Sequence, residues 1–337
     1  MELVAWAAGF GPVLRENAAR HDAAGTWVEE SFAALEDAGM LTLAVPRELG
    51  GMGATIRQIA LVQRELARHC GSTSLALSMH QHVTAFTAWR WRRGLPGAEA
   101  TLQRVAGGET VLASTGGGDF TTPRGTAVKV DGGYRVSGTK RFVSQSPAAF
   151  AMSTMFTLDD AERGRRVLNL AVPFGEGVTI ADNWDTLGMR GTASNDVTVT
   201  DVFVPEDKVL ADRPYGVIDP PLQVILSIAM PIISAVYLGV AEGAAAAAAE
   251  AIGPSKDPSL QRMVGLMETR LRVARWALDG ALETVGDDPG PSMETVADVM
   301  AAKREIALAG VEVTDLAMEA AGGSAFFRGS PIERAYR

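Results

Sequence analysis

The chain has 337 residues, of which 47% are apolar and 21% charged, and its formal net charge at pH 7 is -9. Its length exceeds the roughly 250–300 residues that one hydrophobic core serves, so two or three structural units are expected. The acidic balance and the short basic run at Arg90–Arg93 argue against nucleic-acid binding. A single cysteine, Cys70, allows no internal disulfide, and the N-terminus has no basic signal region, so a cytoplasmic location is expected.

Residues 1–109 are predicted to form an N-terminal helical domain. Apolar residues recur at helical spacing over 29–39 and 56–69, and a third helical run covers about 74–92. The glycines of 50–53 form a turn between the first two runs.

Residues 110–215 are predicted to form a central antiparallel β-barrel. The run 126–130, the turn Asp131-Gly132-Gly133 and the run 134–137 are typical of a hairpin, because Asp-Gly tolerates the positive φ of a tight turn. Further β-rich runs follow, at 166–172 and 196–204. Short strands without long intervening helices indicate a barrel or a sandwich.

Residues 216–337 are predicted to form a C-terminal helical bundle. Three long helical runs, 224–252, 259–285 and 292–321, are separated by Gly- and Pro-containing turns, which is the pattern of antiparallel helices. The first run opens with about 18 residues free of charge, the length that can cross a membrane. Pro231 interrupts this stretch and its flanks are acidic, so a helix buried in the bundle is favoured and no membrane span is expected.

Familiar catalytic and metal motifs do not fit. Gly133–Lys140 approaches a phosphate-binding loop, but it lies in a hairpin instead of between a strand and a helix. His80 and His82 are two residues apart on a predicted helix and point to different sides, so they do not form a zinc pair. The sequence also lacks the Gly-x-Ser-x-Gly elbow of serine hydrolases.

Short motifs in a fixed order remain. They are Leu35–Gly39 followed by Val45-Pro46 and Gly50–Gly53, then Gly138–Ser144, then Leu187–Thr192 continuing to Asp201–Pro205, and finally Ala302-Lys303, Gly322-Gly323 and Pro331–Arg337. In this order they resemble the acyl-CoA dehydrogenase family of flavoproteins over nearly the whole chain. The resemblance implies helical domains at both ends, a β-barrel between them and a flavin where the barrel meets the helices.

The cofactor implied by this resemblance is FAD, with FMN as the alternative. The expected cofactor-binding residues are Ala113, Ser114, Thr115, Gly117, Gly118, Phe142, Ser144, Gly322 and Gly323. Small residues in the loop 113–118 let backbone N–H groups approach flavin or phosphate oxygens. By the resemblance, Phe142 packs beside the isoalloxazine, the Ser144 hydroxyl bonds near flavin N5, and the Gly-Gly pair reaches the cofactor across a subunit boundary.

The catalytic base is not assigned. In most of the family a glutamate removes the substrate's α-proton, and it lies about ten residues beyond the position that matches Arg337. A minority of the family carries the base on the first bundle helix, where Ala229 stands in this sequence.

Three functions are therefore weighed. The leading one is desaturation of an acyl thioester, with acyl-CoA as the expected substrate, by proton abstraction and hydride transfer to flavin N5, with an electron-transfer partner. Phe142-Val-Ser144 in place of Trp-x-Thr also resembles two-component flavin monooxygenases of the same fold, in which His80 or His82 would lie beside the flavin. The third is a non-catalytic subunit of a hetero-oligomer. A dimer or tetramer is expected because the bundle helices are apolar on more than one face.

Overall fold

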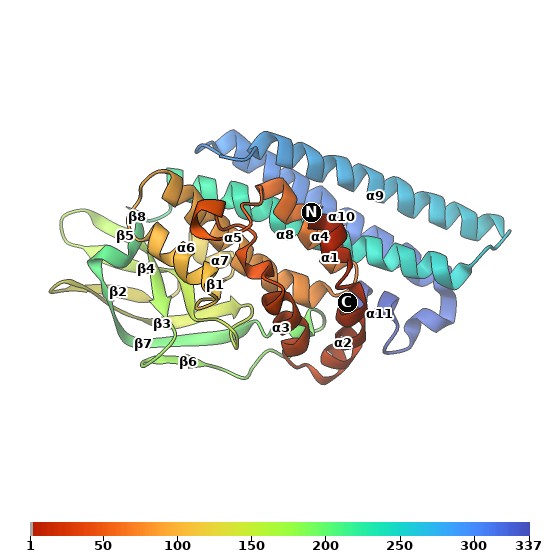
Figure 1. Ribbon diagram of the computed structural model, residues 1–337, viewed down its shortest axis with the longest axis horizontal. Helices are drawn as coiled ribbons and strands as arrows, with labels where there is room; N and C mark the ends of the chain where they lie inside the picture. The colour runs from red at the N-terminus through yellow and green to blue at the C-terminus, as the bar shows by residue number, and fades with distance from the viewer. Residues whose placement is uncertain (1–2) are drawn as a thin grey trace.

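Helices occupy both ends of the sequence and strands occupy its middle. The computed structural model describes residues 3–337, and it is elongated, with the strands at one end and the longest helices at the other (Figure 1). The N-terminal helices are α1 (Leu3–Ala8), α2 (Gly11–Ala24), α3 (Glu29–Asp37), α4 (Ile56–Ala67), α5 (Gly71–Arg92) and α6 (Ala98–Ala106), with short 3-10 turns η1 (Met40–Thr42) and η2 (Arg47–Leu49). The predicted runs at 29–39, 56–69 and 74–92 are thus confirmed as helices.

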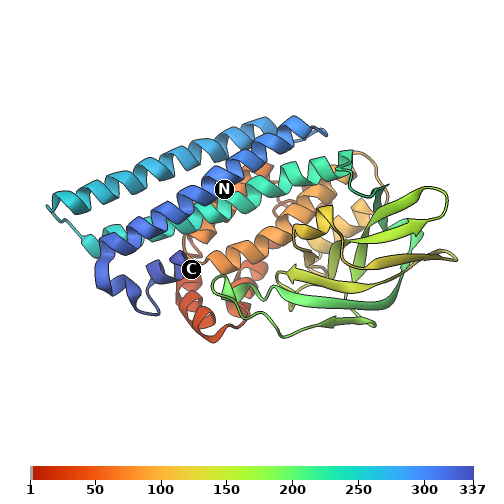
Figure 2. The ribbon, with the colours of Figure 1, turned by 180° about the vertical axis from the view of Figure 1, so that it is seen from behind.

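Local capping explains where α4 and α5 begin. Thr55 and Gln58 form a capping box, in which each side chain accepts a hydrogen bond from the other residue's backbone N–H. Cys70 precedes α5, and its Sγ accepts from the N–H and the hydroxyl of Thr73. α5 then leads from the helical end of the molecule to the sheet and contacts both α8 (Pro220–Ile252) and β1 (Leu112–Ser114) (Figure 2).

The sheet has eight strands and includes the predicted hairpin. β2 (Thr126–Val130) pairs with β3 (Gly133–Val143) around the Asp-Gly turn, as predicted. The remaining middle elements are the short helix α7 (Gly118–Thr121), β4 (Ala151–Asp160), β5 (Gly164–Pro173), β6 (Val178–Ile180), η3 (Arg190–Thr192), β7 (Asn195–Pro205), η4 (Glu206–Lys208) and β8 (Val209–Pro214).

The predicted barrel needs one correction, because the sheet does not close. Among the described residues the strand order runs β6-β7-β3-β2-β4-β5-β8, with β1 beside β4, so β6 and β8 are ends. Two pairings, β1 with β4 and β2 with β4, are parallel instead of antiparallel. The β2–β4 pairing is parallel because the connection from β3 to β4 crosses β2, so β4 lies on the other side of β2 and runs in the same direction as β2. Only two residue pairs join β2 to β4, which leaves two halves around a separate apolar core.

The C-terminal helices pack around α8. They are α8 itself, α9 (Pro258–Val285), α10 (Met293–Ala321), η5 (Gly322–Phe326) and α11 (Pro331–Tyr336). The three long helical runs of the sequence are confirmed. α8 lies between α4 and α5 on one side and α9 and α10 on the other, as Figure 2 shows from behind.

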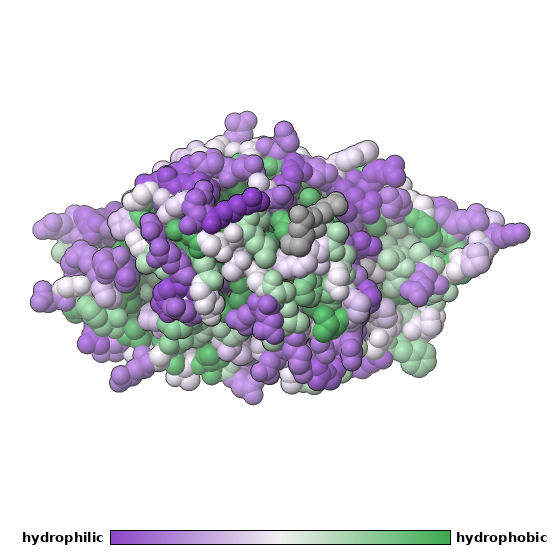
Figure 3. All heavy atoms as spheres, viewed as in Figure 1, coloured by the Kyte–Doolittle hydropathy of each residue, from purple (hydrophilic) through white to green (hydrophobic). Residues whose placement is uncertain are grey.

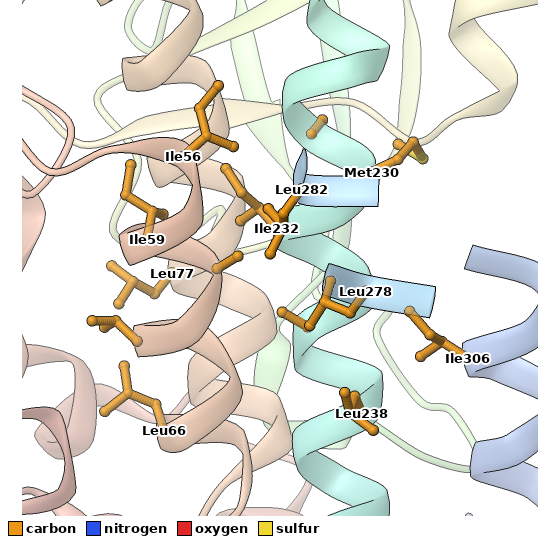
Figure 4. Close-up of a cluster of buried hydrophobic side chains, with 14 of the residues drawn as sticks. Ile56, Ile59, Leu66, Leu77, Met230, Ile232, Leu238, Leu278, Leu282 and Ile306 are labelled. Atoms are coloured by element: carbon orange, nitrogen blue, oxygen red, sulfur yellow. The ribbon is translucent and has the colours of Figure 1, made fainter. Parts of the chain in front are cut away.

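Apolar side chains from five helices meet at α8. Figure 4 shows Ile56, Ile59 and Leu66 of α4, Leu77 of α5, Met230, Ile232 and Leu238 of α8, Leu278 and Leu282 of α9, and Ile306 of α10. α8 is the one helix of the described chain that is long and apolar enough to cross a membrane, and 78% of its most apolar window is buried inside the protein. Polar side chains cover the tips of the sheet and the turn between α8 and α9 (Figure 3).

One buried carboxylate ties three of these helices together. The Glu242 side chain on α8 is 5% exposed and binds Arg64 of α4 through both oxygens, with Nε–Oε2 at 2.8 Å. Arg275 of α9 donates to the same carboxylate at 2.6 Å. Burial alone would raise the pKa of Glu242, but the two guanidinium groups lower it below its ordinary value.

We expect Glu242→Gln to lower the free energy of unfolding by about 3 kcal/mol, because it leaves two arginines facing a neutral amide. Urea unfolding at neutral pH measures this loss. Since the folded pKa of Glu242 is depressed, its contribution is present above the unfolded pKa of about 4.3 and disappears as pH falls through the folded pKa. Glu268→Gln, which removes the exposed second partner of Arg275, is the control and should change stability by less than about 1 kcal/mol. Equal losses in the two variants would contradict this account.

Candidate functional site

Unusual backbone conformations mark one place in the fold. Of the five non-glycine residues with positive φ in the described chain, four lie in the two segments 142–145 and 189–193: Phe142 at 57°, Gln145 at 56°, Met189 at 52° and Ala193 at 43°. Such conformations cost about 1–3 kcal/mol each and persist where surrounding contacts hold them. The segments lie at the end of β3 and at η3, so the fold concentrates backbone strain at a single junction.

Hydrogen bonds join the two strained segments. Gln145 N–H donates to Thr192 O at 2.8 Å, and the Ser146 hydroxyl donates to Ala193 O at 2.9 Å. The hydroxyl of Ser144 lies 2.8 Å from that of Ser194, which in turn lies 2.6 Å from that of Thr192. The predicted site residue Ser144 is 7% exposed, and its hydroxyl has that of Ser194 as its hydrogen-bond partner.

Phe142 presents an open aromatic face beside the Gly-rich loop. Its side chain is 55% exposed, and its ring meets Trp184 edge to face with centroids 5.9 Å apart. A Cβ added at Gly116 would lie 3.1 Å from the Phe142 Cβ, so this glycine permits a close approach of loop and strand. At Gly117 and Gly118 an added Cβ would meet nothing within 4 Å. Gly117 and Gly118 thus border open space, and the exposed Phe142 ring provides a flat surface beside the loop.

A buried ion pair holds the Gly-rich loop in place. Lys140 of β3 is fully buried, and its Nζ donates to Asp119 Oδ2 at 3.1 Å and to the backbone oxygens of Arg124 and Met155. The Thr154 hydroxyl also reaches Asp119, at 3.4 Å, and Thr115, at 3.3 Å. Asp119 is the second residue of the short helix α7 and directly follows the three glycines, so the pair sets where the loop lies relative to β3.

The opposite wall is one face of α5. The Ser114 hydroxyl contacts Met79 Sδ at 3.5 Å. Between Gly71 and Arg90, every residue of α5 is buried except Gly71, Ser72, Leu75 and Met79. Ser72, Leu75 and Met79 recur at spacings of three and four and share one helix face, which passes close to η3, since a Cβ at Gly191 would lie 3.2 Å from Ser72 Cβ. The partly open face of α5 and the strand ends define the candidate site.

The two histidines of α5 have different environments. Leu112 N–H donates to His80 Nδ1 at 3.0 Å, and His80 Nε2–H donates to Leu41 O at 2.9 Å, so both ring nitrogens are occupied by backbone groups. His80 is thereby a structural residue that joins α5 to β1, and it is withdrawn as a flavin-facing candidate. The Gln145 side-chain amide binds the carbonyl of the same residue, donating to Leu112 O at 2.7 Å.

His82 keeps one ring nitrogen free. Its Nδ1–H donates to Ser78 O at 2.9 Å, and Nε2 has no hydrogen-bond partner among residues 3–337. The side chain is 2% exposed, and burial lowers its pKa to about 4, so the ring is neutral at physiological pH. His82 follows Met79 by three residues and lies on the same side of α5 as the face that borders the site.

The other predicted site residues do not all gather here. The Ala113 side chain belongs to the apolar core of the sheet, so only its backbone borders the loop. Gly322 and Gly323 lie in η5, which packs on α10 and α11 at the helical end, far from the strands (Figure 1). Their predicted contact with a cofactor therefore requires a second copy of the chain.

A large cavity adjoins the site along α5. It has a volume of about 970 Å³ and lies where the start of α5 meets α2, α8, α10 and α11. Ser72 and Met189 line it on the side of the junction, and Tyr237 of α8 lines it on the helical side. None of the nine predicted cofactor-binding residues borders this cavity. The described residues contain no group of three potential metal ligands.

Sequence reasoning missed three residues of the junction. Gln145, Ser194 and Lys140 are buried and hydrogen-bonded at its centre. Lys140 lies within the Gly138–Ser144 motif, and a lysine on the same side of the strand as the apolar Tyr134 and Val136 is the signal that could have identified it. Ser194 lies two residues past the motif that ends at Thr192, and nothing in its local sequence distinguishes it from a loop serine.

Domain profiles of acyl-CoA dehydrogenases match most of the chain. The N-terminal domain profile matches residues 11–91, the middle domain profile residues 113–202, and the C-terminal domain profile residues 229–337.

Individual relatives point to more than one activity. The putative acyl-CoA dehydrogenase YdbM of Bacillus subtilis (strain 168) is 30% identical over 350 residues, covering 96% of this chain and 87% of the relative. The amino sugar nitrososynthase DnmZ of Streptomyces peucetius is 32% identical over 248 residues, covering 69% of this chain and 59% of DnmZ. The structure of KijD3 in complex with FMN and dTDP-3-amino-2,3,6-trideoxy-4-keto-3-methyl-D-glucose aligns with a TM-score of 0.89 at 26% identity, over 99% of this chain and 86% of KijD3.

Breaking the ion pair behind the Gly-rich loop should destabilise the fold. We expect Asp119→Asn and Lys140→Met each to lower the free energy of unfolding by about 3 kcal/mol, because each leaves a buried partner uncompensated. The double variant should lose less than the two single losses combined, and urea unfolding of all three proteins measures this coupling. Lys129→Met, at an exposed pair on β2, is the control, with a loss below about 1 kcal/mol. Additive losses would refute a coupled pair.

Proposed function

Because this chain belongs to the acyl-CoA dehydrogenase family, we propose that it binds a flavin at the junction of α5 with the ends of β1 and β3 and uses it as a monooxygenase of a small molecule. FAD and FMN both fit the family and its relatives: FMN is present in the KijD3 complex, and the family as a whole uses FAD. The observation that carries the proposal is His82, an uncharged buried histidine with a free ring nitrogen on the α5 side of the site.

The residues of the junction suit a planar, partly polar ring. The exposed face of Phe142 offers a stacking surface, and aromatic groups prefer offset or edge contacts of this kind. Ser144 offers a fixed hydroxyl for the flavin N5 position. Gly117 and Gly118 leave room for backbone N–H groups to approach polar edges of the ring or its phosphate. A bound flavin supplies two electrons and, when reduced, reacts with oxygen.

A neutral histidine suits oxygen transfer to an amine. In such a reaction R–NH2, O2 and reduced flavin give R–NHOH, water and oxidised flavin, so one oxygen atom enters the substrate and the other leaves as water. A neutral imidazole can accept a hydrogen bond from the amine N–H and take up its proton transiently as the oxygen atom is transferred. Burial keeps the pKa of His82 at about 4, so it remains in this form across physiological pH. Amines are the first substrate class to test, since DnmZ is an amino sugar nitrososynthase.

The proposal also sets the partner and the compartment. In the proposed two-component system, a separate reductase supplies the reduced flavin. Cys70 is a buried free thiol, which agrees with a reducing compartment such as the cytoplasm.

Dehydrogenation of an acyl thioester, as in lipid metabolism, is the second candidate. YdbM, named a putative acyl-CoA dehydrogenase, favours it because that likeness spans 96% of the chain. The chemistry needs a carboxylate base facing the flavin. α5 contains no carboxylate, and α8 contains two: Glu242, which two arginines hold, and Glu250, which lies on the exposed end of the helix. The α8 position that a minority of the family uses for the base is therefore not filled in this chain, whereas the commoner position lies beyond Arg337.

The experiment starts with titration of the purified protein with FMN and FAD, followed by reduction and mixing with oxygen. A monooxygenase gives a transient absorbance that belongs to neither oxidised nor reduced flavin, and an oxygenated amine accumulates. Anaerobic bleaching of the oxidised flavin by an acyl-CoA would instead establish the dehydrogenase. A protein that binds flavin but shows neither reaction until a paralogous chain is added would be the non-catalytic subunit.

His82→Gln tests the residue that carries the proposal. We expect it to bind flavin as the original protein does and to form the oxygenated amine roughly 10²-fold more slowly, because glutamine cannot take up a proton. Product formation per flavin oxidised is the readout, and the original protein should show no inflection between about pH 6 and 8 from His82, given its lowered pKa. His21→Gln, at a histidine in the last turn of α2, is the control. Unchanged product formation in His82→Gln would remove this residue from the chemistry.

A homo-oligomer is part of the same proposal. α9 exposes Leu266, Val273 and Trp276 along one stripe, and α10 exposes Met300, Leu308 and Val311 along another. Arg270 on the first stripe binds Glu312 beside the second, so the two stripes adjoin. Exposed apolar surface on neighbouring helices is typical of a subunit interface, and a second copy would also bring its η5 glycines toward a cofactor.

Charge placed on the stripes should separate the subunits. We expect the original chain to be a dimer or tetramer, and the double variant Trp276→Asp/Val311→Asp to be a monomer, because an interface core excludes unpaired carboxylates. Light scattering at micromolar concentration measures the mass. The matched control is Val128→Asp on β2, an exposed apolar residue outside the stripes, which should leave the mass unchanged. A monomeric original chain would overturn the proposal.

A further inference from the structure

Three buried hydroxyls form a chain that ends at Ser144. We propose that Thr192 and Ser194 are positioning residues that let Ser144 act as a hydrogen-bond donor to oxidised flavin N5 and as an acceptor from reduced flavin N5–H. The inference rests on the proposed flavin site. It adds two residues to that site: Thr192 at the end of η3 and Ser194 just before β7. Neither of them borders the ring.

The geometry of the chain is continuous. Ser144 Oγ lies 2.8 Å from Ser194 Oγ, Ser194 Oγ lies 2.6 Å from Thr192 Oγ1, and Thr192 Oγ1 lies 2.9 Å from the backbone oxygen of Met189. The side chains are buried, with exposed fractions of 7% for Ser144, 4% for Ser194 and 0% for Thr192. Each hydroxyl has one proton, so the direction of one hydrogen bond fixes the direction of the next.

In one direction every proton points away from the ring. Thr192 donates to Met189 O, Ser194 donates to Thr192, and Ser144 donates to Ser194. The lone pairs of the Ser144 hydroxyl are then free to accept a hydrogen bond from the N5–H group of reduced flavin. This is the arrangement that reduced flavin requires.

In the other direction every proton points toward the ring. Thr192 donates to Ser194, Ser194 to Ser144, and Ser144 to the acceptor N5 of oxidised flavin. Met189 O loses the Thr192 hydroxyl but remains satisfied, because Trp184 Nε1–H donates to it at 3.0 Å and Thr192 N–H at 3.1 Å. The spare donors at Met189 O allow the chain to reverse without leaving a buried polar group unpaired.

Removing the Thr192 hydroxyl should therefore weaken the binding of reduced flavin only. Without the Thr192 hydroxyl, Ser194 can still donate to Ser144 in the oxidised state. In the reduced state the Ser194 proton would have no acceptor, and an unpaired buried donor costs roughly 1–3 kcal/mol. Thr192→Val keeps the shape of the side chain and removes the hydroxyl, so it isolates this effect.

The test compares flavin dissociation constants in the two redox states with the midpoint potential of the bound flavin. We expect Thr192→Val to bind oxidised flavin within about twofold of the original protein and reduced flavin about tenfold more weakly. For a two-electron couple, that tenfold change lowers the potential by about 30 mV. Thr192→Ser should restore both constants because it restores the hydroxyl. Thermal unfolding of each variant without flavin checks that the fold is intact.

Ser146→Ala is the matched control. The Ser146 hydroxyl is equally buried and joins the same two segments through Ala193 O, but it is not one of the three linked hydroxyls. The Ser146→Ala variant should therefore change both dissociation constants by the same factor. Equal weakening of both states in Thr192→Val, or no change in either, would overturn the inference and leave the flavin site intact. An original protein that binds no flavin would remove the proposed function together with the inference.

Discussion

The hydrogen bond from Gln145 N–H to Thr192 O joins the two strained segments on which the site depends. Phe142, Gln145, Met189 and Ala193 adopt left-handed conformations that a free loop would leave, and cross-bonds between 142–146 and 189–195 hold them. These bonds also fix the direction in which Ser144 and Phe142 face. The proposed flavin-binding surface is thus built from two segments whose backbone has little freedom.

Two buried charge sites support this arrangement from opposite sides. Lys140 and Asp119 hold the Gly-rich loop against β3, and Glu242 joins α8 to α4 and α9. His80 of α5 accepts a hydrogen bond from Leu112 N–H, and Gln145 of the strained segment donates one to Leu112 O. The helical part and the sheet are therefore connected by specific polar bonds as well as by apolar contact, and the distance between α5 and the strand ends follows from them.

The sequence predicted the large elements well, because long amphipathic helices and the Asp-Gly hairpin depend on local patterns. Closure of the sheet was predicted wrongly, because closure depends on whether the end strands β6 and β8 pair with each other, and no local sequence pattern reports that. For the site, motif likeness predicted Ser114, Phe142 and Ser144 as flavin-binding residues; Ser114 contacts Met79 of α5, and Phe142 and Ser144 lie at the end of β3. It named His80 and His82 as alternatives and did not decide between them. The decision depends on Leu41 and Leu112, whose backbone groups occupy the ring nitrogens of His80 and which are distant in sequence from both histidines.

The central claim is that a flavin ring lies between the Phe142 face, the Gly-rich loop and α5. A crystal structure of the protein grown with FMN tests it most directly. The account predicts ring density against Phe142, with N5 within hydrogen-bond distance of Ser144 Oγ. Ring density elsewhere, for example in the cavity lined by Tyr237 and Ser72, or side chains filling the junction in the presence of bound flavin, would contradict it.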